Sequence, residues 1–123
     1  MIGKLVTAAG VVAATAALAA SAPAAQQGGR LAGKVGPGYT IHLTMNGKAV
    51  KTLTAGTYTF VISDRASIHN FTLEQEKGGK FERDLTGVSF TGTKSVTVKL
   101  RAGKWKYYCK VHEPTMFGFF TVK

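Results

Sequence analysis

The chain has 123 residues, with sixteen lysines and arginines against six acidic residues, and 45% of its residues are hydrophobic. This length suffices for one small domain with a single core, and it excludes a second domain of ordinary size. The basic residues are scattered along the chain rather than gathered into a run or a recognisable binding module, which argues against nucleic acid as a partner.

Residues 1–24 have the layout of a secretory signal peptide. Lys4 precedes an alanine-rich apolar run, and Ala22-Pro23-Ala24 supplies a cleavage site of small residues. The run is only weakly hydrophobic, so a cleaved signal is favoured over an uncleaved anchor, which needs about 20 strongly apolar residues. The sequence therefore predicts an exported protein, located in the bacterial periplasm or elsewhere outside the cytoplasmic membrane, with no membrane span in the mature chain.

Residues 25–34 are polar and rich in glycine, and we expect them to form a flexible lead-in to a domain over residues 35–123. Helical periodicity is absent from this domain, and short alternating runs between turn sequences predict strands instead. The runs cover residues 39–45, 49–53, 57–63, 67–73, 87–93, 95–100, 104–109 and 117–123. Seven or eight short strands in about 90 residues are typical of an all-β, antiparallel two-sheet sandwich with Greek-key connections.

Alternation within the strands predicts which side chains face the core. In residues 104–109, Cys109 shares a face with Trp105, and in residues 67–73 His69 falls on the apolar face. A thiol and an imidazole are therefore expected on hydrophobic inner surfaces.

Cys109 is the only cysteine, although cysteines of exported proteins usually form pairs. Two interpretations without a metal stay open, namely a small buried hydrophobic residue or an intermolecular disulfide. A third interpretation has to account for the neighbouring residues as well.

Cys109, His112 and Met116 place a thiolate, an imidazole and a thioether within eight residues, where a predicted strand ends and a loop begins. Such ligands suit copper, because magnesium and calcium prefer oxygen and structural zinc rarely recruits methionine. His69 adds a second imidazole from a distant strand. Two histidines, one cysteine and one methionine are typical of a trigonal blue copper site with a weak axial ligand. We therefore expect one copper ion (Cu+/Cu2+) per chain.

Two segments carry a resemblance to a known family: YTFVISDRASIHNF at 58–71 and YYCKVHEPTMFGFFTV at 107–122. They resemble the cupredoxins, in particular the small plastocyanin-like and pseudoazurin-like blue copper proteins. The resemblance covers nearly the whole mature chain and implies a cupredoxin-like sandwich. It implies four copper ligands, which are His69, Cys109, His112 and Met116.

The resemblance also implies roles beyond ligation. Asn70 is expected to point its backbone N–H at the Cys109 sulfur and to brace the ligand loop with its side chain. His112 is expected at the surface, where one exposed ring edge provides the electron's exit, whereas His69 is expected to be buried.

The favoured function is an exported blue copper protein that shuttles single electrons between envelope redox partners. Donor and acceptor are expected to be proteins with acidic docking faces, because the chain is cationic, and the chain is expected to be a monomer. A copper carrier, chaperone or buffer in the envelope is the second interpretation, and a metal-free adhesion sandwich is the third. No enzyme is expected, because no supported catalytic motif is present and the protein fills the copper positions.

Other chemically suggestive residues are assigned to packing or to the solvated surface. His42 is interpreted as a surface or strand-packing residue, and Met45 as a packing residue. A solvated loop is expected to carry four acidic residues, which are Glu74, Glu76, Glu82 and Asp84. Phe117 and Phe119 either form an exposed apolar patch beside the ligand loop or tuck under residues 74–92.

Overall fold

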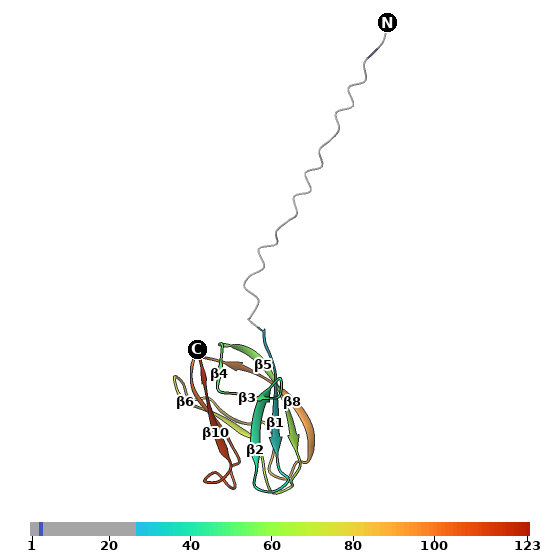
Figure 1. The fold of residues 1–123 in the computed structure, drawn as a ribbon, viewed down its shortest axis with the longest axis vertical. Coiled ribbons are helices and arrows are strands. Elements are labelled where there is room, and N and C mark those ends of the chain that lie inside the picture. Colours follow the sequence, from blue (N-terminus) through green and yellow to red (C-terminus); the bar gives the residue numbers. More distant parts are fainter. Residues whose placement is uncertain (1–2, 4–26) are drawn as a thin grey trace.

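The computed structural model describes Gly3 and residues 27–123, and residues 27–123 form strands and loops without a helix (Figure 1). Apart from Gly3, the predicted signal peptide at 1–24 lies outside the described residues, and so do residues 25 and 26 of the expected lead-in. Within this described part, no helix of the length and apolarity needed to cross a membrane is found.

Ten strands form two five-stranded sheets that face each other. The first sheet contains, in spatial order, β3 (Lys48–Ala49), β2 (Ile41–Met45), β1 (Gln27–Val35), β5 (Gly56–Asp64) and β8 (Gly92–Leu100). The second contains β4 (Thr52–Leu53), β10 (Phe117–Val122), β9 (Gly103–Tyr108), β6 (Thr72–Lys77) and β7 (Glu82–Asp84). The all-β, two-sheet prediction is confirmed. The sheets are mixed rather than purely antiparallel, because β1 pairs with β5 and β4 pairs with β10 in parallel.

Residues 27–34, expected to be a flexible lead-in, instead belong to β1 at the centre of the first sheet. The strand pairs with β2 on one side and β5 on the other, and Leu31 and Val35 are completely buried. Three glycines, Gly28, Gly29 and Gly33, obscure this strand in the sequence, because they lack the side chains by which a strand is normally identified. Two neighbouring strands supply the hydrogen bonds that stabilise it.

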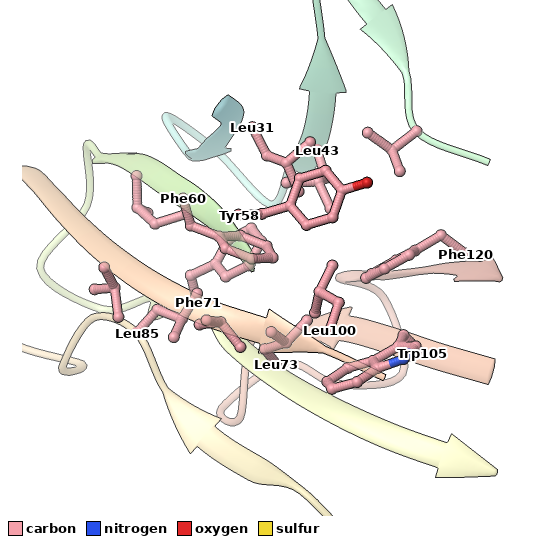
Figure 2. Close-up of a cluster of buried hydrophobic side chains, with 14 of the residues drawn as sticks. Leu31, Leu43, Tyr58, Phe60, Phe71, Leu73, Leu85, Leu100, Trp105 and Phe120 are labelled. Carbon is pink, nitrogen blue, oxygen red and sulfur yellow. The ribbon is translucent and has the colours of Figure 1, made fainter. Parts of the chain in front are cut away.

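The core lies between the two sheets (Figure 2). β5 shows strict alternation, with Tyr58, Phe60 and Ile62 buried and the intervening residues half-buried. From the second sheet, Trp105 and Phe120 stack at a centroid distance of 6.2 Å and close the core at one end. The predicted inward face of residues 104–109 is confirmed by the burial of Trp105 and Cys109.

Two predicted strands are wrong in part. Residues 67–71 form a turn and loop, and β6 begins only at Thr72. Most of residues 87–93 is also irregular, since β8 begins at Gly92. In residues 67–71 the alternating residues His69 and Phe71 are still buried, so the pattern there predicts burial without a strand, whereas in residues 87–93 Val88 is exposed and Phe90 only half-buried.

The acidic residues expected on a solvated loop lie on the neighbouring strands β6 and β7. Their side chains remain largely on the surface, and Asp84 forms an ion pair with Lys110 at 3.0 Å. The Asp84 carboxylate raises the pKa of the Lys110 ammonium. His42 is exposed on β2, while Met45 packs against the core, as expected.

Phe117 and Phe119 lie on the outer face of the second sheet and are 46% and 43% exposed. The Lys104 ammonium lies 4.5 Å above the centre of the Phe119 ring. The alternative in which these rings tuck under residues 74–92 is therefore wrong.

Candidate metal centre

Three side chains meet at the end of the sandwich where β1, β5 and β9 finish and β2, β6 and β10 begin. His69 Nδ1 lies 3.0 Å from His112 Nδ1, and each nitrogen lies 3.8 Å from Cys109 Sγ. In this triangle, the point equidistant from the three atoms is about 2.1 Å from each, close to the ~2.0–2.3 Å of metal bonds to imidazole and thiolate. Without rearrangement, the donor set thus fits one first-row transition metal.

His69 is fixed by the loop between β1 and β2. Its Nε2 lies 2.8 Å from the carbonyl oxygen of Gly38, and a carbonyl only accepts hydrogen bonds. In the neutral ring the proton is therefore on Nε2, and the unprotonated Nδ1 points at the other two donors. Gly38 has φ of +75°, a conformation that side chains disfavour, so glycine is suited to presenting this carbonyl.

A short closed loop holds Cys109 and His112 in place. Cys109 follows the last residue of β9, and its N–H donates to the Met116 carbonyl at 3.0 Å. The Met116 N–H donates in turn to the His112 carbonyl at 2.9 Å, and the Met116 side chain is completely buried. All four residues expected from the sequence therefore occupy the same end of the sandwich, where Met116 closes the loop that carries two of them.

Burial differs among the three clustered donors. Cys109 is completely buried and unpaired, which excludes an intermolecular disulfide unless the loop opens. His69 is 1% exposed, whereas His112 is half-buried. The site therefore has a closed inner side, formed by the thiol and one imidazole, and an outer side at His112.

Tyr39 covers this outer side, and nothing in the sequence pointed to it. Its ring is 60% exposed and packs edge-on against both imidazoles, with centroid distances of 5.3 Å to His69 and 4.9 Å to His112. Tyr39 is thirty residues from the nearer histidine along the chain, so only folding brings the rings together. The adjacent Gly38 carbonyl was missed for the same reason.

Asn70 joins the two segments that carry the donors. Its side-chain oxygen accepts from the Lys110 N–H at 2.8 Å, directly after Cys109, and its Nδ2 donates to Thr72 Oγ1 at 2.8 Å. Thr72 donates onward to Asp84, which is paired with Lys110. The expected bracing by the Asn70 side chain is therefore present, while its backbone contact to the sulfur stays a prediction.

Replacing Asn70 with Ala is expected to lower the free energy of unfolding by about 1–3 kcal/mol, because buried partners lose their hydrogen bonds. Asn70→Asp keeps the acceptor for the Lys110 N–H, but it buries a carboxylate whose second oxygen faces the Thr72 oxygen, so it should destabilise at least as much. Urea unfolding of the two variants tests this order. Equal stability of Asn70→Ala and the parent protein would contradict the bracing role.

A second hydrogen-bond chain holds the loop that precedes β6. Asp64, at the buried end of β5, accepts from the Ala66 N–H at 3.2 Å and from Thr86 Oγ1 at 3.0 Å. Thr86 Oγ1 accepts from the Phe71 N–H at 2.9 Å. Burial raises the pKa of the Asp64 carboxyl, although these hydrogen bonds oppose the effect. The residues on both sides of His69 are thus anchored to the body of the sandwich.

The fold and the donor set define a β-sandwich with one compact His–Cys–His group among its described residues. No family model matches the sequence, and comparison with curated proteins gives no match. Solved structures do match, among them several of rusticyanin.

A structure of the copper protein rusticyanin aligns with a TM-score of 0.55 and 17% identity, covering 78% of each chain. Reduced rusticyanin aligns with a TM-score of 0.54 and 16% identity, covering 78% of this chain and 80% of the other. Rusticyanin from Thiobacillus ferrooxidans aligns with a TM-score of 0.51 and 22% identity, covering 78% of each chain. Rusticyanin is a cupredoxin, so this chain has the cupredoxin fold that its sequence predicted.

Proposed function

We propose that this chain is an exported mononuclear blue copper protein that carries single electrons between redox partners in the cell envelope. The principal observation is the arrangement of Cys109, His69 and His112, whose donor atoms surround a point at metal-bonding distance. The shared fold with the copper protein rusticyanin supports the same proposal. One copper per chain, cycling between Cu+ and Cu2+, would supply the redox chemistry.

The roles of the residues follow from their positions. Cys109 supplies a buried thiolate, and His69 and His112 supply imidazole nitrogens. We assign the weak axial position to Met116, supported by its complete burial and by its backbone hydrogen bonds to both ligand-loop residues. The hydrogen bonds of His69 and Asn70 restrain the donors, so that little rearrangement accompanies electron transfer.

His112 is the proposed exit for the electron, because it is the least buried of the three clustered donors. Because side chains of the protein fill the proposed copper positions, we propose an electron carrier rather than an enzyme. The partners are proposed to be redox proteins with acidic docking faces, since basic residues outnumber acidic ones sixteen to six, and the carrier is proposed to act as a monomer.

Residues 1–24 are proposed to be a signal peptide that directs the protein to the bacterial periplasm or otherwise outside the cytoplasmic membrane. Expression of the full gene followed by mass measurement of the exported protein tests this. A mature chain that begins near residue 25 agrees with the proposal, and full-length protein retained in the cytoplasm contradicts it.

The decisive test of the copper proposal is a visible spectrum after addition of Cu2+ to the purified protein. An intense blue band from charge transfer between thiolate and copper is expected at one copper per chain. A colourless protein under oxidising conditions would overturn the electron-carrier proposal.

A copper carrier is the second candidate, favoured by the half-buried position of His112, from which a metal can exchange with a partner. Chelator exchange and electron self-exchange, measured on the same preparation, separate the two functions. Rapid metal loss with slow electron exchange identifies a carrier, and the opposite pattern identifies an electron shuttle.

Replacing Tyr39 with Ala is expected to speed copper loss to a chelator about tenfold, because two edge-on aromatic contacts that hold the imidazoles are lost. Tyr39→Phe retains the ring and is expected to lose copper at the parent rate. The rates are measured by bleaching of the blue band in excess chelator. Equal rates for Tyr39→Ala and the parent would show that the ring does not retain the metal.

A further inference from the structure

The outer face of the first sheet has a hollow of about 490 Å³ that none of the four proposed copper ligands lines. Its lining residues are Ala32, Gly33, Lys34, His42, Thr44, Val61, Ser63 and Arg65. They come from three adjacent strands, β2, β1 and β5, and from the residue directly after β5. The hollow is therefore formed mainly by the central strands of the sheet, and only Arg65 comes from a loop.

The register of the strands explains why this face is concave. Ala32 on β1 lies beside Thr44 on β2 and Val61 on β5, so that one row across the sheet consists of small side chains. In the next row, Lys34 lies between His42 and Ser63. The row of small side chains forms the floor of the hollow, and the row with Lys34 borders it. Because adjacent strands are about 4.8 Å apart, the polar side chains of that second row are closely spaced.

The chemistry of the rim is cationic. Lys34 and Arg65 are exposed, and Arg65 Nε donates to Ser63 Oγ at 3.4 Å. Within residues 27–123, Glu113 forms an ion pair with Lys106, and Asp84 forms one with Lys110. Lys106 lies on β9 of the second sheet, and Lys110 lies in the loop after β9. Neither cation of the rim is neutralised by these pairs.

The acidic residues are segregated from this face. Asp64 is the only acidic residue in the first sheet, and it is buried with hydrogen bonds to Ala66 and Thr86. The remaining acidic residues belong to the second sheet or to the loop after Cys109, and they are Glu74, Glu76, Glu82, Asp84 and Glu113. The outer face of the first sheet thus carries positive charge without surface carboxylates.

The shape and lining of the hollow distinguish between three kinds of anionic partner, namely a small molecule, a nucleic acid and an acidic peptide. Half of its lining residues are exposed and only Gly33 is buried, whereas pockets for small molecules usually enclose about 70–90% of the ligand surface. The His42 imidazole is its only ring, and no Phe, Tyr or Trp lines it, so it lacks the row of aromatic platforms on which successive nucleic-acid bases stack. An extended segment with carboxylate side chains fits best, because Arg and Lys bind carboxylates through charge-assisted hydrogen bonds.

We propose that this hollow is a docking site for an acidic peptide segment of a protein partner, with Lys34 and Arg65 receiving its carboxylates. This proposal rests on the acidic partner proposed above and specifies the surface that binds it. Binding at this surface does not require copper. The hollow lies on the first sheet, whereas His112 lies in the loop between β9 and β10 of the second sheet. A segment docked in the hollow is therefore expected to leave His112 free.

The test uses a hexaglutamate peptide and the ¹⁵N-labelled full chain, observed by NMR with and without copper. Amide shifts are expected to cluster at residues 32–34, 42–44 and 61–65 in both states. The double variant Lys34→Glu/Arg65→Glu is expected to bind about tenfold more weakly, because two favourable charge contacts become repulsive. The control Lys48→Glu/Lys99→Glu makes the same change of net charge on the edge strands β3 and β8.

Comparable weakening by the control would attribute binding to total charge and would overturn the proposal. Shifts centred on the His112 end, or tighter binding of inorganic phosphate or a single-stranded oligonucleotide to the same residues, would also overturn it. Because the measurement does not need copper, a negative result leaves the copper function intact, and a colourless protein leaves this site intact.

Discussion

Cys109→Ser is expected to abolish the blue band completely, while the parent protein turns blue with one equivalent of Cu2+. The band requires a thiolate, and a serine hydroxyl is not deprotonated in its place. Because the completely buried sulfur is replaced by an atom of similar size, the fold should survive the change. Absorbance titration with Cu2+ measures the loss, and circular dichroism checks that the variant is folded.

The matched control for this experiment is His42→Ala. His42 is exposed on β2 and does not belong to the clustered donors, so its removal should leave both the band and its copper stoichiometry unchanged. A blue Cys109→Ser protein would show that the thiol is not a ligand. A colourless His42→Ala protein would place the copper elsewhere.

Phe120→Ala is expected to lower the free energy of unfolding by about 3–5 kcal/mol, since it removes a large buried side chain and leaves a cavity. Phe120 is 2% exposed and packs with Trp105 and Tyr107 between the sheets. A domain of this size is stable by about 5–15 kcal/mol, so the variant loses a large part of its stability. Urea unfolding followed by tryptophan fluorescence measures the difference.

The neighbouring Phe119 provides the control, because it has the same side chain on the opposite face of β10. It is 43% exposed, and its ring contacts the Lys104 ammonium at 4.5 Å and the Phe117 ring at a centroid distance of 5.7 Å, both on the outer face. Phe119→Ala should therefore cost less than about 1 kcal/mol. Equal losses for the two variants would contradict the assignment of inner and outer faces in this strand.

The spacing of residues in the last third of the chain was sufficient to predict that three candidate donors share one compact loop. Cys109, His112 and Met116 are close in sequence, and a strand that ends at a short turn leaves few ways to arrange them. The inward orientation of Cys109 also followed from alternation, and the structure confirms its burial. Local geometry accounts for this success.

His69 illustrates both the strength and the weakness of such patterns. Alternation correctly predicted its burial but assigned it to a strand, whereas it lies in a loop before β6. The hydrogen bonds that orient this loop come from Gly38, Thr86 and Lys110, and they join residues 15 to 40 positions apart. A local pattern contains no information about these contacts.

The sequence by itself determined the two-sheet sandwich and the candidate metal donors, because side-chain periodicity and ligand chemistry are local properties. Only the tertiary structure decided that residues 27–34 form the central strand β1 and that two strand pairs are parallel. It also placed Tyr39 against both imidazoles and formed the cationic hollow beside Lys34. These features depend on strand register and on contacts between distant segments, which exist only after the chain has folded.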